Sequence, residues 1–258
     1  MSSSNDPIRR LRRLLEYTPH PDVNQMIRDR RHVLSRYSEV FSSSAVSIMS
    51  PEEFAGFLEF ENNRHWWGMQ RGADRMVHNI ELLRWTLTVL LDESRPIEDR
   101  IDEIDSPSSG SAVPGFDHSI YTPVLLMSAP DQYGVWNHIS ETAMGRLGLW
   151  PDLSDAETNG ARYRRINDMI LMVAADLETD FWTLDAMWWA IEKEHDPGSH
   201  FVNRRSAPRA SSPRPKARTP STRKASRPQQ TTFLCENCFQ QKSLSLASDD
   251  PNICVDCA

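Results

Sequence analysis

The sequence predicts an all-α protein: a multi-helix globular domain, a disordered basic linker and a small C-terminal module that contains four cysteines. Three observations support this prediction. Apolar residues recur at steps of three and four through most of residues 1–203, whereas alternating strand patterns are scarce. Residues 204–230 contain Pro, Ser, Arg and Lys and almost nothing to bury. All four cysteines lie in residues 231–258, so these three ranges are the expected domains.

The first clear helix start is in the stretch "SPEEFAGFLEF". Ser50 is expected to be the N-cap, Pro51 occupies the first helical position, and Glu53 completes a capping box. The next stripe steps by three or four and indicates one buried helical face: Met76, Ile80, Leu83, Leu87 and Leu90. The turn-rich stretch "SPSSGSAVPG" (Ser106 to Gly115) then separates two helical halves.

Two more helices are expected after this loop. The first has a regular apolar stripe, formed by Ile166, Met169, Ile170, Val173 and Leu177. It is entered through a Ser154–Glu157 capping box. The second is "TLDAMWWAIEKEH", for which Thr183 is the expected N-cap.

Charge is distributed very unevenly. Residues 1–203 carry 19 Lys/Arg and 32 Asp/Glu (net −13), residues 204–228 carry 9 basic and no acidic residues (net +9), and residues 229–258 have a net charge of −3. Contact with nucleic-acid phosphates is therefore expected from the basic segment, or from a local patch on the acidic domain.

Membrane insertion and secretion are not expected. No run approaches about 18 consecutive apolar residues, and the start "MSSSNDPIRRLRRLLEY" lacks the apolar core of a secretory signal. The cysteine pattern is that of a metal site, which favours a reducing cytoplasm.

The four cysteines form the most specific motif in the chain. Cys235 and Cys238 make one C-x2-C pair, and Cys254 and Cys257 make a second, with fifteen residues between the pairs. Two such turns complete a closed tetrahedral shell for a structural Zn²⁺, which would supply the folding energy of so small a module. The alternative is a redox dithiol or two disulfides. The module resembles a zinc ribbon or knuckle, and such modules bind either nucleic acid or protein.

Two stretches carry more polar and aromatic residues than packing requires. "FLEFENNRHWWGMQRG" contains Asn63, His65 and Trp66, and "DQYGVWNHISETAMGRLGLW" contains Tyr133, Trp136, Asn137 and His138. Each could be a helix-end polar network, in which Asn137 caps a helix by accepting from the amides of Ile139 or Ser140. Each could instead bind a substrate, because stacking aromatic rings beside polar groups suit an extruded nucleobase.

A resemblance favours the second interpretation. "TPVLLMSAPDQYGVWNHISETAMGRLGL" resembles a segment of prokaryotic proteins, including modules that accompany restriction systems. The segment is also similar to the later part of the helix-hairpin-helix DNA glycosylases, over about residues 120–190. In that family an Asp at the head of a helix stabilises the positive charge that develops on the sugar. The matching residue here is Asn137, which the resemblance marks as a catalytic position.

The chain also departs from that family. An Asn cannot carry the negative charge, the Gly-rich hairpin is missing, and no Lys lies near Gly160 to act as a covalent nucleophile. If the site is active, another carboxylate must serve. The candidates are Asp185, Asp180, Glu59 and Glu61. We take Asp185 as the second catalytic candidate; the alternative is that it is simply a favourable charge in the first turn of its helix.

The substrate-binding residues are expected to be Asn63, His65, Trp66, Tyr133 and Trp136. Two functions from different classes then remain open. The first is a DNA-binding, DNA-processing protein, a glycosylase-like hydrolase for modified or damaged bases in DNA repair or antiviral defence, whose 204–228 linker contacts DNA. The second is a non-enzymatic adaptor whose zinc module and helical domain each bind a protein partner.

Overall fold

The computed structural model describes residues 6–17, 20–59, 66, 68–106, 112–193, 232–234 and 241–243. The chain divides into two units, residues 1–202 and 203–258. The helical elements of the first unit are α1 (Pro7–Glu16), α2 (Pro21–Val40), α3 (Ser43–Val46), α4 (Pro51–Leu58), the 3-10 helix η1 (Met69–Gly72), α5 (Ala73–Val77), α6 (Ile80–Leu90), α7 (Ile97–Ile104), α8 (His118–Ser128), α9 (His138–Leu147), α10 (Asn159–Leu177) and α11 (Phe181–Lys193). The prediction of an all-α fold is confirmed for this unit.

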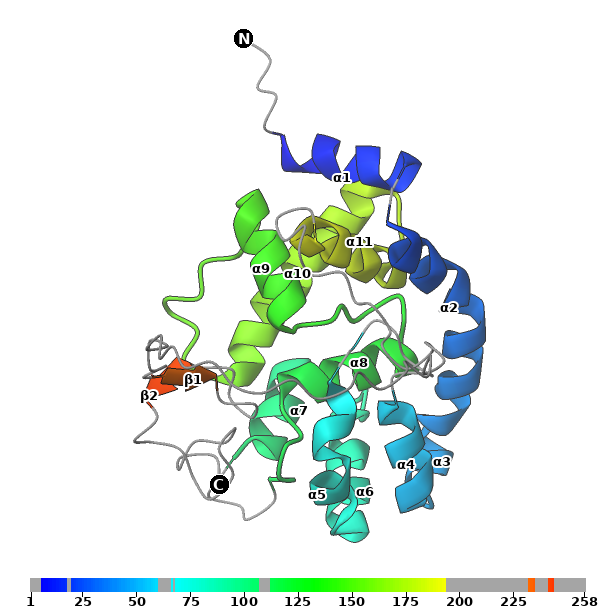
Figure 1. The fold of residues 1–258 in the computed structure, drawn as a ribbon. Helices are drawn as coiled ribbons and strands as arrows, with labels where there is room; N and C mark the ends of the chain where they lie inside the picture. Colours follow the sequence, from blue (N-terminus) through cyan, green and yellow to red (C-terminus); the bar gives the residue numbers. More distant parts are fainter. Residues whose placement is uncertain are drawn as a thin grey trace, which may run out of the picture. The chain divides into compact units, whose positions relative to one another are not determined.

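One hydrophobic core runs from Leu11 in α1 to Ile191 in α11. The most extensive helix pairs are α10 with α7 and α11 with both α9 and α2. Figure 1 shows α1, α9 and α11 toward one end and α3 to α6 toward the other, with α2 running between them. The two halves expected on either side of the 106–115 loop are therefore halves of the sequence only, because helices from both contribute to this core.

The second unit contributes two short strands. β1 (Thr232–Leu234) pairs antiparallel with β2 (Gln241–Ser243), and Thr232 lies opposite Ser243. The C-x2-C pair of Cys235 and Cys238 lies in the connection between these strands in sequence. All four cysteines lie outside the described residues, as does the predicted linker.

Several predicted helix ends are confirmed and others are wrong. The Ser50 hydroxyl accepts from the Glu53 amide at 3.2 Å, and the Glu53 carboxylate accepts from the Ser50 amide at 2.7 Å, so the capping box at α4 is present. The stripe that begins at Met76 is not one helix. It is divided between α5 and α6, because the Asn79 side chain caps α6 through the amide of Leu82 at 3.1 Å.

The starts of the last two helices also differ from the predictions. α10 begins at Asn159 behind Thr158, whose hydroxyl accepts from the Ala161 amide at 3.1 Å, so the predicted Ser154–Glu157 box does not cap it. α11 begins at Phe181, and the Asp180 carboxylate accepts both the amide and the hydroxyl of Thr183 at 2.9 Å. Asp180 therefore does the capping expected of Thr183, since a carboxylate satisfies two donors at once.

The α7–α10 contact depends on a close approach of the two backbones. A Cβ on Gly160 would lie 2.2 Å from the Glu98 carbonyl oxygen, and the Gly160 amide donates to Asp102 Oδ1 at 2.8 Å. Within the described residues, no helix is both long and apolar enough to cross a membrane.

Candidate functional site

Trp66 and Asp185 meet in the interior of the helical unit, although 119 residues separate them in sequence. The Trp66 indole Nε1 donates to Asp185 Oδ2 at 3.2 Å. Only 4% of Trp66 and 2% of Asp185 is exposed. Asp185 lies on α11, and Trp66 lies between α4 and η1. Folding thus brings together one predicted catalytic residue and one predicted substrate-binding residue.

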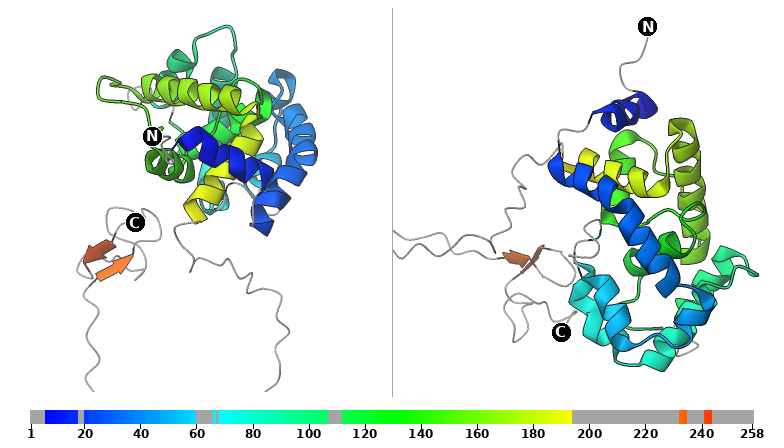
Figure 2. Two further views of the ribbon diagram at one scale, coloured as in Figure 1. Left: turned by 90° about the horizontal axis from the view of Figure 1, so that it is seen from above. Right: turned by 90° about the vertical axis from the view of Figure 1, so that its right-hand side faces the viewer.

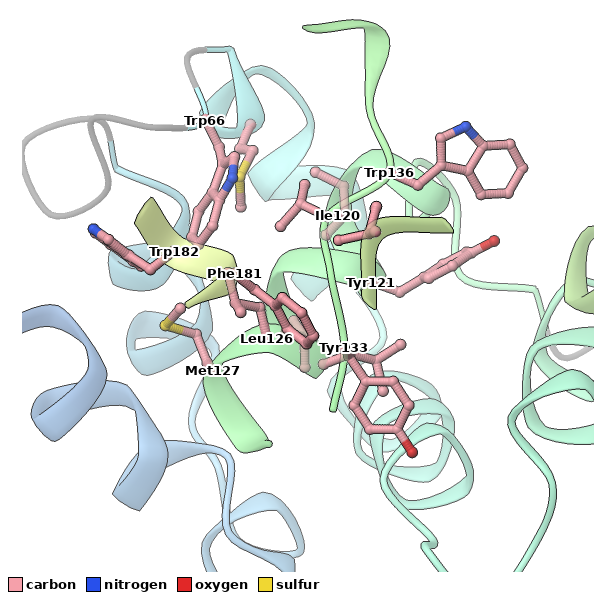
Figure 3. Packing of buried hydrophobic residues seen from close by; sticks show 14 of the residues in the cluster. Trp66, Ile120, Tyr121, Leu126, Met127, Tyr133, Trp136, Phe181 and Trp182 are labelled. Atoms are coloured by element: carbon pink, nitrogen blue, oxygen red, sulfur yellow. The ribbon is translucent and has the colours of Figure 1, made fainter. Parts of the chain in front are cut away.

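Aromatic rings surround this pair. Trp182 contacts Trp66 edge to face, with ring centroids 5.8 Å apart, and Phe57 lies 6.2 Å from Trp66. The Trp182 indole donates to the Met26 carbonyl at 2.7 Å, which fixes its ring between α11 and α2. Figure 3 shows the Trp66 and Trp182 rings close together, on the far side of Ile120 from Trp136. The Asp185 carboxyl is therefore held among aromatic side chains with little polar surface.

This environment changes the protonation of Asp185. Burial raises its pKa to about 8, against the opposing effect of the Trp66 hydrogen bond, so the side chain is mostly neutral at pH 7. An indole N–H can only donate, so Oδ2 acts as the acceptor and the proton resides on Oδ1. Asp185 Oδ1 is buried, and none of the described residues forms a hydrogen bond with it. The helix-terminus explanation of this residue is wrong: Asp185 is a buried acid in the second turn of α11.

The second predicted cluster, residues 129–137, is a different kind of region. It is an extended segment that joins α8 to α9. The Tyr133 hydroxyl accepts from Arg100 Nη2 at 2.6 Å and donates to Glu93 at 2.8 Å. Arg100 is itself buried and donates to the Leu90 carbonyl at 2.9 Å. Burial raises the pKa of Tyr133, so its hydroxyl stays protonated and links the segment to α7.

The backbone at Gly134 is satisfied by side chains of α10. Its amide donates to Asn167 Oδ1 at 2.7 Å, and its carbonyl accepts from the Tyr163 hydroxyl at 2.9 Å. Asn167 also donates through Nδ2 to the Gln132 carbonyl at 2.9 Å. A Cβ at position 134 would lie 2.5 Å from Ile170 Cγ2, so glycine is required for this close packing.

The residues that follow are also fixed by local partners. The Trp136 amide donates to the Thr122 hydroxyl at 2.9 Å, and its indole donates to Glu141 at 2.7 Å. The His118 ring stacks on the Trp136 indole at a centroid distance of 4.2 Å. These contacts place Trp136 between the starts of α8 and α9, where packing alone accounts for its position.

Asn137 caps α9 as expected. Its Oδ1 accepts from the amides of Ile139 and Ser140 at 2.9 and 3.0 Å, and the Asn137 amide donates to the Ser140 hydroxyl at 2.9 Å. No described residue accepts from Asn137 Nδ2, which leaves both of its N–H donors for a ligand. His138 is exposed, in keeping with the helix-end interpretation.

The predicted site residues thus separate into two groups. Trp66 and Asp185 touch each other, whereas Tyr133, Trp136 and Asn137 belong to the hydrogen-bonded segment between α8 and α9. Asn63 and His65 lie outside the described residues. Sequence reasoning did not identify Asn167 and Arg100 as partners of that segment. The available signal in the sequence was a polar side chain, Asn or Arg, on the buried side of an amphipathic helix.

Among the residues that the structure covers, no group of three or more His, Cys, Asp or Glu side chains is arranged to hold a metal ion. Comparisons with protein-family models, with curated proteins and with solved structures find no match for this chain.

Proposed function

We propose that this chain binds DNA and processes it by hydrolysing the bond between a base and its sugar. One observation carries the reaction: Asp185 is a buried, neutral acid whose Oδ1 has no partner among the described residues, and its Oδ2 accepts from Trp66, which packs on Trp182. An extruded base requires aromatic contact for its ring and a hydrogen-bonding group for its edge, and this site contains both.

The chemistry assigned to Asp185 is general acid catalysis. Asp185 donates the proton on Oδ1 to a ring nitrogen of the base, and the base–sugar bond breaks with its electron pair leaving on the base. Water adds hydroxide to the sugar carbon and returns a proton to Asp185, so the products are a free base and an abasic site. A pKa near 8 suits this role, since a general acid works best when its pKa is near the working pH.

The basic segment supplies the affinity in this proposal. Nine cations in residues 204–228, with no acidic residue among them, would release counterions from DNA. Deleting Arg204 to Arg227 should remove most non-specific affinity and flatten its salt dependence. Binding that is unchanged by the deletion would reduce the segment to a spacer.

The four cysteines are proposed to bind one structural Zn²⁺. The support is their spacing, together with the position of Cys235 and Cys238 between two paired strands in sequence. Chelation should release one zinc per chain and unfold the C-terminal module, while the helical circular dichroism signal remains because the helical core is separate. Retention of the metal by a variant without the cysteines would contradict this assignment.

The reaction is tested by incubating the full-length protein with plain and modified duplex and single-stranded DNA and measuring abasic sites. Asp185→Asn should lower the rate at least about 100-fold, because an amide cannot donate an acidic proton. The matched control is Asp105→Asn. Burial also raises the pKa of Asp105, but its Oδ2 already accepts from Asn159 at 2.9 Å and from Tyr121 at 3.5 Å. Equal losses in both variants, or abasic sites formed by neither wild type nor variant, would overturn the proposed reaction.

A further inference from the structure

The first two helices differ in charge from the rest of the helical unit. Residues 6–40 carry 8 Arg and 5 Asp or Glu, a net of +3, whereas residues 41–203 carry 11 basic and 27 acidic residues, a net of −16. The two helices adjoin the same element, because α1 packs on α10 and α11 and α2 packs on α11. A basic region is therefore concentrated on one part of an acidic domain.

Some of these arginines have structural roles. Arg12 donates to the Asp176 carbonyl near the end of α10 at 2.9 Å, and Arg30 pairs with Asp180 at 3.0 Å. Both contacts hold α1 or α2 against its neighbours. The positions of these two side chains are explained by the fold.

Arg9, Arg13 and Arg31 are different. All three side chains are exposed, and none of them forms a hydrogen bond or an ion pair with another residue in the part of the chain that the structure describes. Arg9 and Arg13 are four residues apart on α1, on the side opposite the buried Leu11 and Leu14. Arg31 lies on the outer side of α2, away from the buried residues Val23, Met26, Val33 and Tyr37.

We propose that Arg9, Arg13 and Arg31 contact the phosphate backbone of a nucleic acid, as a second contact besides the 204–228 segment. This inference rests on the proposed function. A guanidinium presents a planar set of donors that matches phosphate oxygens, and unpaired surface arginines lose no internal ion pair when they bind. These charges also belong to the part of the helical unit with a net positive charge, residues 6–40.

The same helix chemistry could suit an anionic membrane, but the packing argues against that partner. A basic amphipathic helix binds a bilayer by inserting its apolar face. In α1 this face is already used: Leu11 and Leu14 are buried in the core, and Ile8 and Leu15 pack against it. The arginines are left on the outer side of the helix without an apolar face to insert beside them, which favours a polyanion over a lipid surface.

The test uses the full chain, binding to duplex DNA, and the slope of log affinity against log salt concentration. The variant Arg9→Gln/Arg13→Gln/Arg31→Gln should lower the slope magnitude by about 2 to 3, because each lost phosphate contact removes about 0.9. The matched control, Arg95→Gln/Arg164→Gln/Arg165→Gln, removes the same charge from arginines that pair with Glu103, Asp168 and Asp155. Its slope should change by less than 1.

The outcomes separate this inference from the proposed function. If the wild-type chain does not bind DNA at low salt, the proposed function fails. If it binds and the two triple variants have equal slopes, Arg9, Arg13 and Arg31 are not phosphate contacts. A phosphatidylserine vesicle is the second probe, and loss of vesicle binding with an unchanged DNA slope would assign these arginines to a membrane contact and overturn the proposal.

Discussion

The Trp66–Asp185 site and the segment between α8 and α9 are both buried and both contain polar groups, but they are satisfied very differently. In the segment, the Gly134 amide and carbonyl and the Asn167 amide group all have partners at 2.7 to 2.9 Å. At the site, Asp185 Oδ2 has a partner, whereas Oδ1 has none among the described residues. Nearly all buried polar groups in proteins are paired, so the paired contacts of Gly134 and Asn167 indicate a structural role and the unpaired Oδ1 suggests a functional one.

The two regions should differ most in how their contributions to the unfolding free energy depend on pH. The folded-state pKa of Asp185 is about 8, and an unfolded Asp titrates near 3.9, so the folded chain holds an extra proton between these values. The contribution of Asp185 to the unfolding free energy therefore falls as the pH rises from about 4 to about 8. At about 1.4 kcal/mol per pKa unit the loss is on the order of several kcal/mol. Asp185→Asn should not show this loss of stability, and urea unfolding of both proteins between pH 5 and pH 9 measures the difference. Parallel stability curves would mean that Asp185 is ionised in the fold.

The second largest effect is expected in the paired network. Asn167→Ala would leave the Gly134 amide and the Gln132 carbonyl without their partners, which should lower the unfolding free energy by about 2 to 3 kcal/mol. Urea unfolding at a single pH is sufficient. Asn159→Ala is the control, since its exposed amide bonds only to Asp105, and it should cost less than about 1 kcal/mol. If both variants lose the same stability, burial of the Asn167 network contributes little.

Trp66→Phe tests the hydrogen-bond donor of the Trp66–Asp185 pair. It keeps the aromatic ring but removes the indole N–H, so stability should fall by about 1 to 2 kcal/mol. The pKa of Asp185 should also rise further, because the hydrogen bond from Trp66 opposes the effect of burial. Unfolding measured across pH tests both effects. Trp136→Phe removes an indole bond to Glu141 instead and should leave the pH dependence unchanged.

Asn137 gives the smallest expected effect on stability. Ser and Asp cap helices about as well as Asn, so Asn137→Ser and Asn137→Asp should each change stability by less than about 1 kcal/mol. If Nδ2 also binds a ligand, DNA binding or base excision should fall about tenfold or more, since neither substitute provides a donor and an acceptor at the reach of the Asn amide. Asn137→Asp could instead raise base excision if its carboxylate acts as in the glycosylases. Unchanged function in both variants, judged by melts and a DNA-binding assay, would leave Asn137 as a cap alone.

Local features of the fold could be predicted from sequence, because their partners are a few residues apart. The capping box of Ser50 and Glu53 and the cap at Asn137 are of this kind. Errors arose where two local caps competed. Asp180, not Thr183, caps α11. Asn79 caps α6, and so divides an apolar stripe whose helical spacing continues from α5 into α6.

The candidate site could be predicted only in part. Trp66 and Asp185 were each identifiable as unusual residues, but periodicity contains no information about a hydrogen bond across 119 positions. The same limit explains why Tyr133 was expected to bind substrate. Its partner Arg100 lies 33 residues away, and that contact makes Tyr133 a structural link.

The packing of α1 and α2 against α10 and α11 has a consequence for how the chain folds during synthesis. Arg12 bonds to Asp176 across 164 positions, and Trp182 bonds to Met26 across 156. The apolar faces of α1 and α2, which are synthesised first, therefore stay partly uncovered until α10 and α11 have been synthesised. Such non-local closure slows folding and leaves apolar surface exposed on the nascent chain. We expect the helical unit to become resistant to protease on the ribosome only after α11 has left the exit tunnel, so a chain stalled before Phe181 should still be cleaved.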